Sequence, residues 1–294
     1  FSDRVVRGSI QSSDGEVLAQ TNVYEDGTEE RTYPFSNIFA HAVGYDTNGK
    51  SGLESEANFQ LLTSHSFFLE QMKNEFLGKK NQGDTVISSL NADLQTTAYN
   101  SLGDRRGAVV VLEPSTGRIL AMVSKPDFDP NTIAQNWDTL VNDESNSSLL
   151  NRATNGAYPP GSTFKAAQAL TFLQEGIIQT NTPAFPCAHG FNYGSLHVGC
   201  HAHGSPLPLI PAIATSCNSY FCWGLFRMFG DRKYGSSQNA ITVWKDHMVS
   251  QGFGYKLGVD LPGEKRGLIP NAQFYDKAYR GRWNGLTVIS IAIG

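Results

Sequence analysis

The chain has 294 residues, which is enough for one large domain or two ordinary ones, and 40% of them are hydrophobic, which is enough for a core. Its net charge of −4 and pI near 6.0 exclude an electrostatic basis for nucleic-acid binding. No apolar run of about 18 residues occurs, so the sequence predicts no membrane-spanning helix.

Residues 1–82 differ in character from the rest of the chain and begin with a predicted β-hairpin. Residues 4–10 have strand character, a Ser-Asp-Gly turn follows at 13–15, and residues 17–19 predict a returning strand. We expect Arg4 and Arg7 to be ion-paired structural groups, and His41 to be a packed or hydrogen-bonded residue. The polar stretch at residues 81–84 predicts a turn and marks the expected domain boundary.

Residues 83–294 predict a domain that mixes strands and helices. A strand is predicted at 85–90, and a helix at 91–102 with Asn91 as its N-cap. Residues 107–112 and 118–123 are apolar runs joined by a Pro-Ser-Thr-Gly turn, which predicts a β-hairpin in a covered sheet. Residues 180–209 predict an irregular segment.

A predicted helix at residues 162–177 carries the first chemical pattern. Two prolines and a glycine lead the chain into it, and Gly176 closes it. Ser162 lies in the first turn, and Lys165 lies three residues later on the same face. A serine hydroxyl needs a neighbouring base to act as a nucleophile, and a desolvated lysine can be that base. The free N–H groups at the start of the helix stabilise a nearby oxyanion.

A second helix predicted at residues 210–229 carries Ser216 and Asn218, which form a Ser-x-Asn element. The Ser-x-x-Lys pair alone is a weak signal, because an N-cap serine with a solvated lysine is common. Joined to a Ser-x-Asn element, the pair is typical of β-lactamases and penicillin-binding proteins.

The run Tyr-Pro-Pro-Gly-Ser-Thr-Phe-Lys at residues 158–165 resembles the active-serine motif of the class B penicillin-binding proteins, the peptidoglycan transpeptidases. The resemblance covers nearly the whole chain, including the Arg-Gly-x-Ile run at 7–10. It implies an α/β (α+β) fold. Residues 83–294 would form a penicillin-binding transpeptidase domain with a central antiparallel sheet flanked by helices, and residues 1–82 a β-rich N-terminal pedestal module.

The resemblance also implies the chemistry. Ser162 would be the nucleophile, Lys165 its base, Ser216 a proton relay to the leaving amine, and Asn218 a hydrogen-bonding partner of Lys165 or of the substrate backbone. The implied enzyme is a D-Ala-D-Ala transpeptidase that cross-links peptidoglycan stem peptides, is acylated by β-lactam antibiotics and needs no cofactor for catalysis. A β-lactam sensor and a serine β-lactamase are the alternatives, and the pedestal disfavours both.

The third motif of the family, Lys-Thr-Gly or Lys-Ser-Gly, does not occur after Asn218. We therefore expect that the sequence ends before this motif, and that the chain is a poor enzyme as it stands. The resemblance further implies an N-terminal membrane anchor outside these residues, an extracytoplasmic location, and a glycosyltransferase partner among the membrane cell-wall synthesis proteins.

All four cysteines of the chain lie between residues 187 and 222. Three of them and one histidine could form a closed, structural zinc site; the predicted ligands are Cys187, Cys200, His203 and Cys217. A Cys187–Cys200 disulfide and free thiols remain as alternatives. The other candidate imidazoles belong to His189, His197 and His201.

Overall fold

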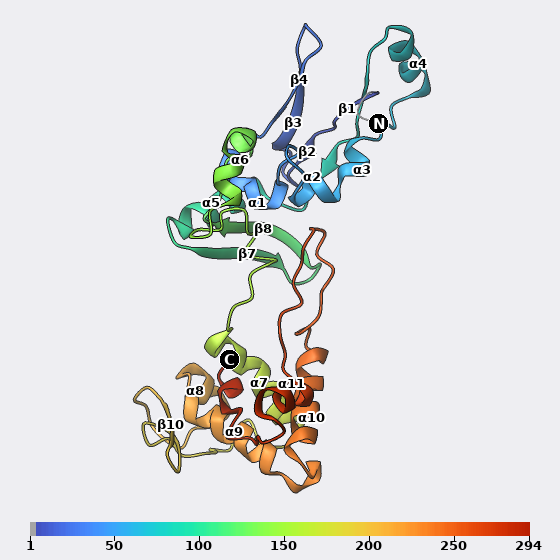
Figure 1. The fold of residues 1–294 in the computed structure, drawn as a ribbon. Coiled ribbons are helices and arrows are strands. Elements are labelled where there is room, and N and C mark those ends of the chain that lie inside the picture. Colours follow the sequence, from blue (N-terminus) through green and yellow to red (C-terminus); the bar gives the residue numbers. More distant parts are fainter. Residues whose placement is uncertain (1–3) are drawn as a thin grey trace. The chain divides into compact units, whose positions relative to one another are not determined.

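The computed structural model describes residues 4–294, which divide into two compact units (Figure 1). The first unit runs to Gly156 and includes Gly258–Lys265, and the second contains Ala157–Leu257 and Arg266–Gly294. Each unit contains strands and helices, so the mixed α/β fold is confirmed. Among residues 4–294, no helix combines the length and the apolar character that a bilayer crossing requires.

The first unit is built on a small four-stranded sheet with the order β4-β3-β2-β6. The strands are β1 (Val5–Val6), β2 (Ile10–Gln11), β3 (Val17–Val23), β4 (Glu29–Thr32), β5 (Asn81–Gln82) and β6 (Val86–Ile87). The strand predicted at 85–90 is thus reduced to β6, which pairs in parallel with β2. The β1 strand pairs in parallel with β5. The predicted boundary near residue 82 therefore falls between two strands that both pair with the N-terminal segment.

This unit also contains a long antiparallel hairpin, as the apolar runs predict, but Val110 and Leu112 are exposed, so the prediction that its sheet is covered is wrong. The hairpin consists of β7 (Gly107–Glu113) and β8 (Arg118–Lys125), with Gly107 opposite Lys125. Helix α5 (Ala92–Leu102) packs against both strands. Its predicted N-cap is confirmed, because the Asn91 side chain accepts a hydrogen bond from the Leu94 N–H at 2.9 Å. The remaining helices are η1 (Ser36–Phe39), α1 (Ala40–Val43), α2 (Gly52–Glu56), α3 (Asn58–Leu61), α4 (Phe68–Phe76), η2 (Pro130–Thr132) and α6 (Ile133–Val141).

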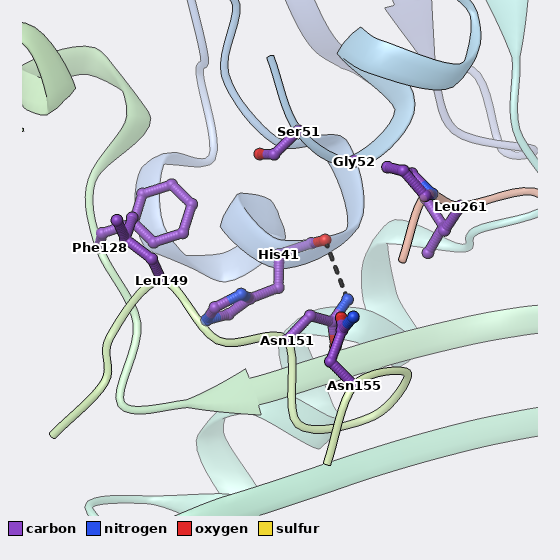
Figure 2. Close-up of a pocket in the computed structure, with 9 residues that line it drawn as sticks. His41, Ser51, Gly52, Phe128, Leu149, Asn151, Asn155 and Leu261 are labelled. Carbon is purple, nitrogen blue, oxygen red and sulfur yellow. Dashed lines mark hydrogen bonds between the residues drawn. The ribbon is translucent and has the colours of Figure 1, made fainter. Parts of the chain in front are cut away.

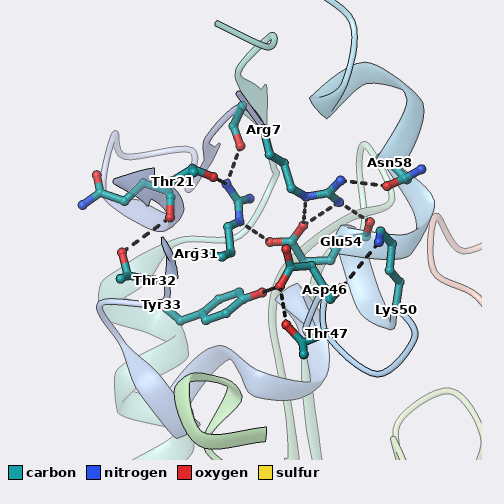
Figure 3. Close-up of polar contacts among 12 residues, drawn as sticks. Arg7, Thr21, Arg31, Thr32, Tyr33, Asp46, Thr47, Lys50, Glu54 and Asn58 are labelled. Carbon is teal, nitrogen blue, oxygen red and sulfur yellow. Dashed lines mark hydrogen bonds and ion pairs between the residues drawn. The ribbon is translucent and has the colours of Figure 1, made fainter. Parts of the chain in front are cut away.

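A buried ion cluster holds the N-terminal segment, β4 and α2 together (Figure 3). The Glu54 side chain is fully buried between the guanidinium groups of Arg7 and Arg31, whose side chains are 9% and 6% exposed. Arg7 also donates to the Asn58 side chain at 2.7 Å. The prediction that Arg7 is an ion-paired structural group is confirmed.

His41 lines a small cavity of about 90 Å³ within the same unit (Figure 2). Its Nε2 lies 3.3 Å from the Pro126 carbonyl oxygen, and its ring meets Phe128 edge-on at 5.2 Å. Burial lowers the pKa of His41 to about 4, so the imidazole is neutral near pH 7. The prediction that His41 is a packed, hydrogen-bonded residue is confirmed.

The second unit is a helical assembly with α9 at its centre. Its elements are η3 (Gly161–Phe164), α7 (Lys165–Gln174), β9 (Gly190–Tyr193), β10 (Leu196–Gly199), α8 (Leu209–Ala214), α9 (Asn218–Gly230), η4 (Arg232–Tyr234), α10 (Ser237–Ser250), α11 (Ala272–Tyr279) and η5 (Ile289–Ala292). Helices α7 and α9 pack closely at Gly224, where an added Cβ would lie only 2.6 Å from the Phe172 ring. The segment expected to be irregular contains the β9–β10 hairpin, whose strands were not predicted.

A charged cluster ties the end of α7 to η4 and α10. The Glu175 carboxylate accepts from the Tyr234 hydroxyl, from His247 Nε2 at 2.7 Å and from Lys233 Nζ at 2.9 Å. Led by the Tyr234 hydroxyl, these contacts outweigh burial and lower the pKa of Glu175 to about 2.

Candidate active site

The first motif lies where a short 3₁₀ turn passes into an α-helix. Ser162 belongs to η3, and Lys165 opens α7, so the serine lies in the first helical turn, as predicted. The α-helix ends at Gln174, three residues before the predicted Ile177, because Gly176 takes a φ of +69° that favours glycine.

The second motif breaks the helix that the sequence predicts there. Helix α8 ends at Ala214 and α9 begins at Asn218, so a continuous helix over 210–229 is wrong. Ser216 sits between them with a φ of +52°, a left-handed conformation that is strained for a non-glycine residue. This kink directs both oxygens of Ser216 at Lys165: its carbonyl lies 2.8 Å and its Oγ 3.0 Å from Nζ.

Lys165 is the centre at which the two motifs meet. Its side chain is 99% buried, and Nζ also lies 3.2 Å from Ser162 Oγ and 2.5 Å from Asn218 Oδ1. Burial lowers the pKa of Lys165, and the nearby thiol groups, Cys200 first, oppose this shift. The structure therefore brings all four predicted catalytic side chains together in the second unit.

The hydrogen bonds around Lys165 can be arranged for a neutral amine. Four oxygens surround Nζ, and both the ammonium form and the neutral form can bond to three of them. A neutral amine has two N–H groups, which can go to the Ser216 carbonyl and Asn218 Oδ1, the two atoms that only accept. Its lone pair is then left to accept the proton of a serine hydroxyl, which is what a general base must do.

The cysteine cluster forms a second group of side chains beside this site. The ligand atoms of Cys187, Cys200, His203 and Cys217 all lie within 4.8 Å of one another, and these are the four residues predicted as zinc ligands. All four cysteines of the chain are free thiols, so the disulfide alternative is absent from this structure. Cys222 lies in the core, outside the cluster.

The donor set of this cluster is chemically suited to zinc, which prefers thiolate and imidazole ligands in a tetrahedral arrangement. Burial opposes ionisation of Cys200, but contacts led by His203 outweigh it and lower the pKa of this thiol to about 7. Burial raises the pKa of Cys217 to about 12.

Two contacts of the site were not foreseen from the sequence. The Asn218 N–H points at Cys200 Sγ at 3.2 Å, and Asn218 Nδ2 donates to the Gly199 carbonyl at 2.8 Å. Both partners lie in the segment expected to be irregular. Every residue has a backbone carbonyl, so no sequence pattern could have identified Gly199 as the hydrogen-bond acceptor of Asn218.

Comparisons with known proteins agree over almost the entire chain. Residues 107–294 match the penicillin binding protein transpeptidase domain, and residues 7–86 match the penicillin binding protein A dimerisation domain. The peptidoglycan D,D-transpeptidase MrdA of Acinetobacter baumannii is 31% identical over 90% of this chain and 43% of its own length. The peptidoglycan D,D-transpeptidase PbpA of Mycolicibacterium smegmatis is 35% identical over 73% of this chain and 48% of its own length. The chain thus spans less than half the length of these relatives.

A solved structure extends the likeness to the fold. The crystal structure of Pseudomonas aeruginosa PBP2 in complex with WCK 5153 matches 99% of this chain and 65% of its own chain, with a TM-score of 0.78 and 28% identity.

Proposed function

Because the chain belongs to the penicillin-binding protein transpeptidase family, we propose that it carries the acylation site of a peptidoglycan D,D-transpeptidase, which cross-links stem peptides and is acylated by β-lactams. The observation that carries this proposal is the buried amine of Lys165, 3.2 Å from Ser162 Oγ and in contact with both groups of the second motif. This arrangement can turn a hydroxyl into a nucleophile without a cofactor.

The first half of the reaction forms an ester on Ser162. Its Oγ attacks the carbonyl carbon of the D-Ala–D-Ala peptide bond while its proton passes to the lone pair of Lys165 Nζ. The backbone N–H of Ser162 supplies one donor to the oxyanion that develops. The tetrahedral species then collapses, the C–N bond breaks, and Ser216 passes a proton from Lys165 to the departing D-alanine amine.

The second half transfers the acyl group to another stem peptide. Its amine attacks the ester carbonyl, a C–N bond forms, and the C–O bond to Ser162 breaks as the proton lost by the amine passes to Ser162 Oγ. The amide of Asn218 holds Lys165 in place through both steps. A β-lactam reacts in the same way: Ser162 Oγ attacks the carbonyl of its ring amide, the ring opens, and the drug remains as an ester on Ser162.

The test is the intact mass of the chain after incubation with a penicillin, beside the Ser162→Ala variant. We expect one adduct of one drug mass, absent from the variant. The same measurement on a longer chain that continues past Gly294 shows whether residues beyond it are required for acylation. No Ser162-dependent adduct on either chain would overturn the proposal. Transfer of the acyl group to an added acceptor amine, rather than to water, separates a transpeptidase from a β-lactamase or a sensor.

We also propose that Cys187, Cys200, His203 and Cys217 hold a structural zinc ion. The convergence of their ligand atoms within 4.8 Å supports this. Metal analysis of the purified chain is expected to find one zinc per chain, lost in Cys187→Ser and kept in Cys222→Ser, a matched control outside the cluster. A wild-type chain without zinc after exposure to the ion would refute the site.

The wider setting is likewise a proposal. We propose a pedestal module at residues 1–82 and a transpeptidase domain at 83–294, which the two family matches support. As in the family, the protein would act outside the cytoplasm on a membrane anchor, together with a glycosyltransferase. Localisation of a tagged full-length protein by cell fractionation tests the anchor, and co-purification tests the glycosyltransferase.

A further inference from the structure

The β9–β10 hairpin rests on the helix that begins at Asn218. The side chain of Phe191 in β9 is fully buried, and its ring centroid lies 4.7 Å from that of Trp223 and 6.2 Å from that of Phe226, both in α9. Gly190 and Gly199 pair at the open end of the hairpin. The hairpin is therefore packed against the helix that begins with Asn218.

At this open end the hairpin touches the site. The Gly199 carbonyl accepts from Asn218 Nδ2 at 2.8 Å, while Asn218 Oδ1 faces Lys165 Nζ at 2.5 Å. The two ends of a primary amide are nearly equal in shape and opposite in hydrogen bonding. Because a carbonyl can only accept, Gly199 selects the rotamer that presents the amide oxygen to Lys165.

We infer that the β9–β10 hairpin is a positioning element of the acylation site, and that its Gly199 carbonyl sets the orientation of the Asn218 amide. With the amide reversed, Oδ1 would face the Gly199 carbonyl, and an N–H of Asn218 would compete with the Ser162 hydroxyl for the lone pair of Lys165. The lysine could then no longer take up the serine proton. This inference rests on the proposed function, and Gly199 acts only through Asn218.

Gly190 offers a way to move the Gly199 carbonyl without changing any group of the site. Its φ is +151°, and an added Cβ would lie 2.3 Å from the Val198 carbonyl oxygen, next to Gly199 in β10. Gly190→Ala therefore forces the two strands apart at this point. Gly204→Ala is the matched control, since its Cβ would have no atom within 4 Å.

The experiment is a double-mutant cycle on acylation by a penicillin, measured as the first-order constant at saturating drug. We expect Gly190→Ala to lower this constant about tenfold, the effect of one misplaced hydrogen bond. In the Asn218→Ala background the same change should have no further effect. The half-saturating drug concentration should hardly change, and Gly204→Ala should behave as wild type.

Additive losses, or wild-type acylation of Gly190→Ala, would overturn the inference. If thermal melting shows that Gly190→Ala does not fold, Phe191→Leu replaces it in the cycle with Asn218→Ala, because it weakens the packing of the hairpin on α9 less severely. The expected results are the same. The lack of a Ser162-dependent adduct on both this chain and the longer chain that continues past Gly294 refutes the proposed function itself. Ser162-dependent acylation with an additive cycle refutes only the role of the hairpin.

Discussion

The buried ion cluster of the first unit allows a quantitative prediction. Two guanidinium groups share one carboxylate: Arg7 Nε lies 2.6 Å from one oxygen of Glu54, and Arg31 Nε lies 2.7 Å from the other. The Glu54 side chain has no exposed surface. The substitution Glu54→Gln keeps the volume of the side chain but removes its charge, and turns one acceptor into a donor that faces a guanidinium.

The expected cost is about 3–5 kcal/mol in the free energy of unfolding of this unit, the range found when one partner of a buried ion pair is removed. The loss is at the upper end because two cations are left without a counter-charge instead of one. An exposed ion pair would contribute at most about 1 kcal/mol, so the magnitude itself distinguishes the two cases.

The assay is native-state hydrogen exchange of peptides that cover β3 and β4, because it reports on this unit separately. Glu56→Gln is the matched control, since Glu56 lies in the same helix and is exposed. A change below about 1 kcal/mol for Glu54→Gln would refute the reasoning. Replacing the whole triad by apolar residues of similar volume should recover most of the loss, because it removes the buried charges together.

Three further predictions concern the second unit. Acylation should rise with pH as Lys165 loses its proton and level off below the usual lysine pKa of 10.5, since burial lowers that pKa; a midpoint at or above 10.5 in a rate–pH profile would contradict the neutral base. Glu175→Gln should lower the melting temperature by about 2–4 °C at pH 7. Because the folded pKa of Glu175 is about 2, the wild type keeps its higher melting temperature in full above the unfolded pKa and loses it as pH falls toward 2. A difference in melting temperature between wild type and variant that stays constant down to that pH would disprove this prediction. Gly224→Ala places a Cβ 2.6 Å from the Phe172 ring and should cost about 1–3 kcal/mol in chemical denaturation; Gly230→Ala, with no atom within 4 Å, is its control, and equal stability of the two would count against this packing.

The parts of the structure that depend on near neighbours could be predicted from the sequence. The β7–β8 hairpin follows from two apolar runs around a turn, and α5 begins where Asn91 caps it. Ser162 and Lys165 lie three residues apart, so a single helical turn brings them together and their pairing needed no further information.

Only the tertiary structure decided how distant segments meet. Ser216 adopts a strained left-handed conformation against the helical pattern around it, because the gain lies in its contacts with Lys165, a residue far away in the sequence. The orientation of Asn218 depends on the backbone carbonyl of Gly199, and carbonyls are common to all residues. Residue types therefore determined which chemistry this chain can perform. The packing of α9 against α7 and the hairpin determined where the atoms of the candidate site lie. The sequence could not show this, because side-chain patterns encode local periodicity and not the direction of a backbone group.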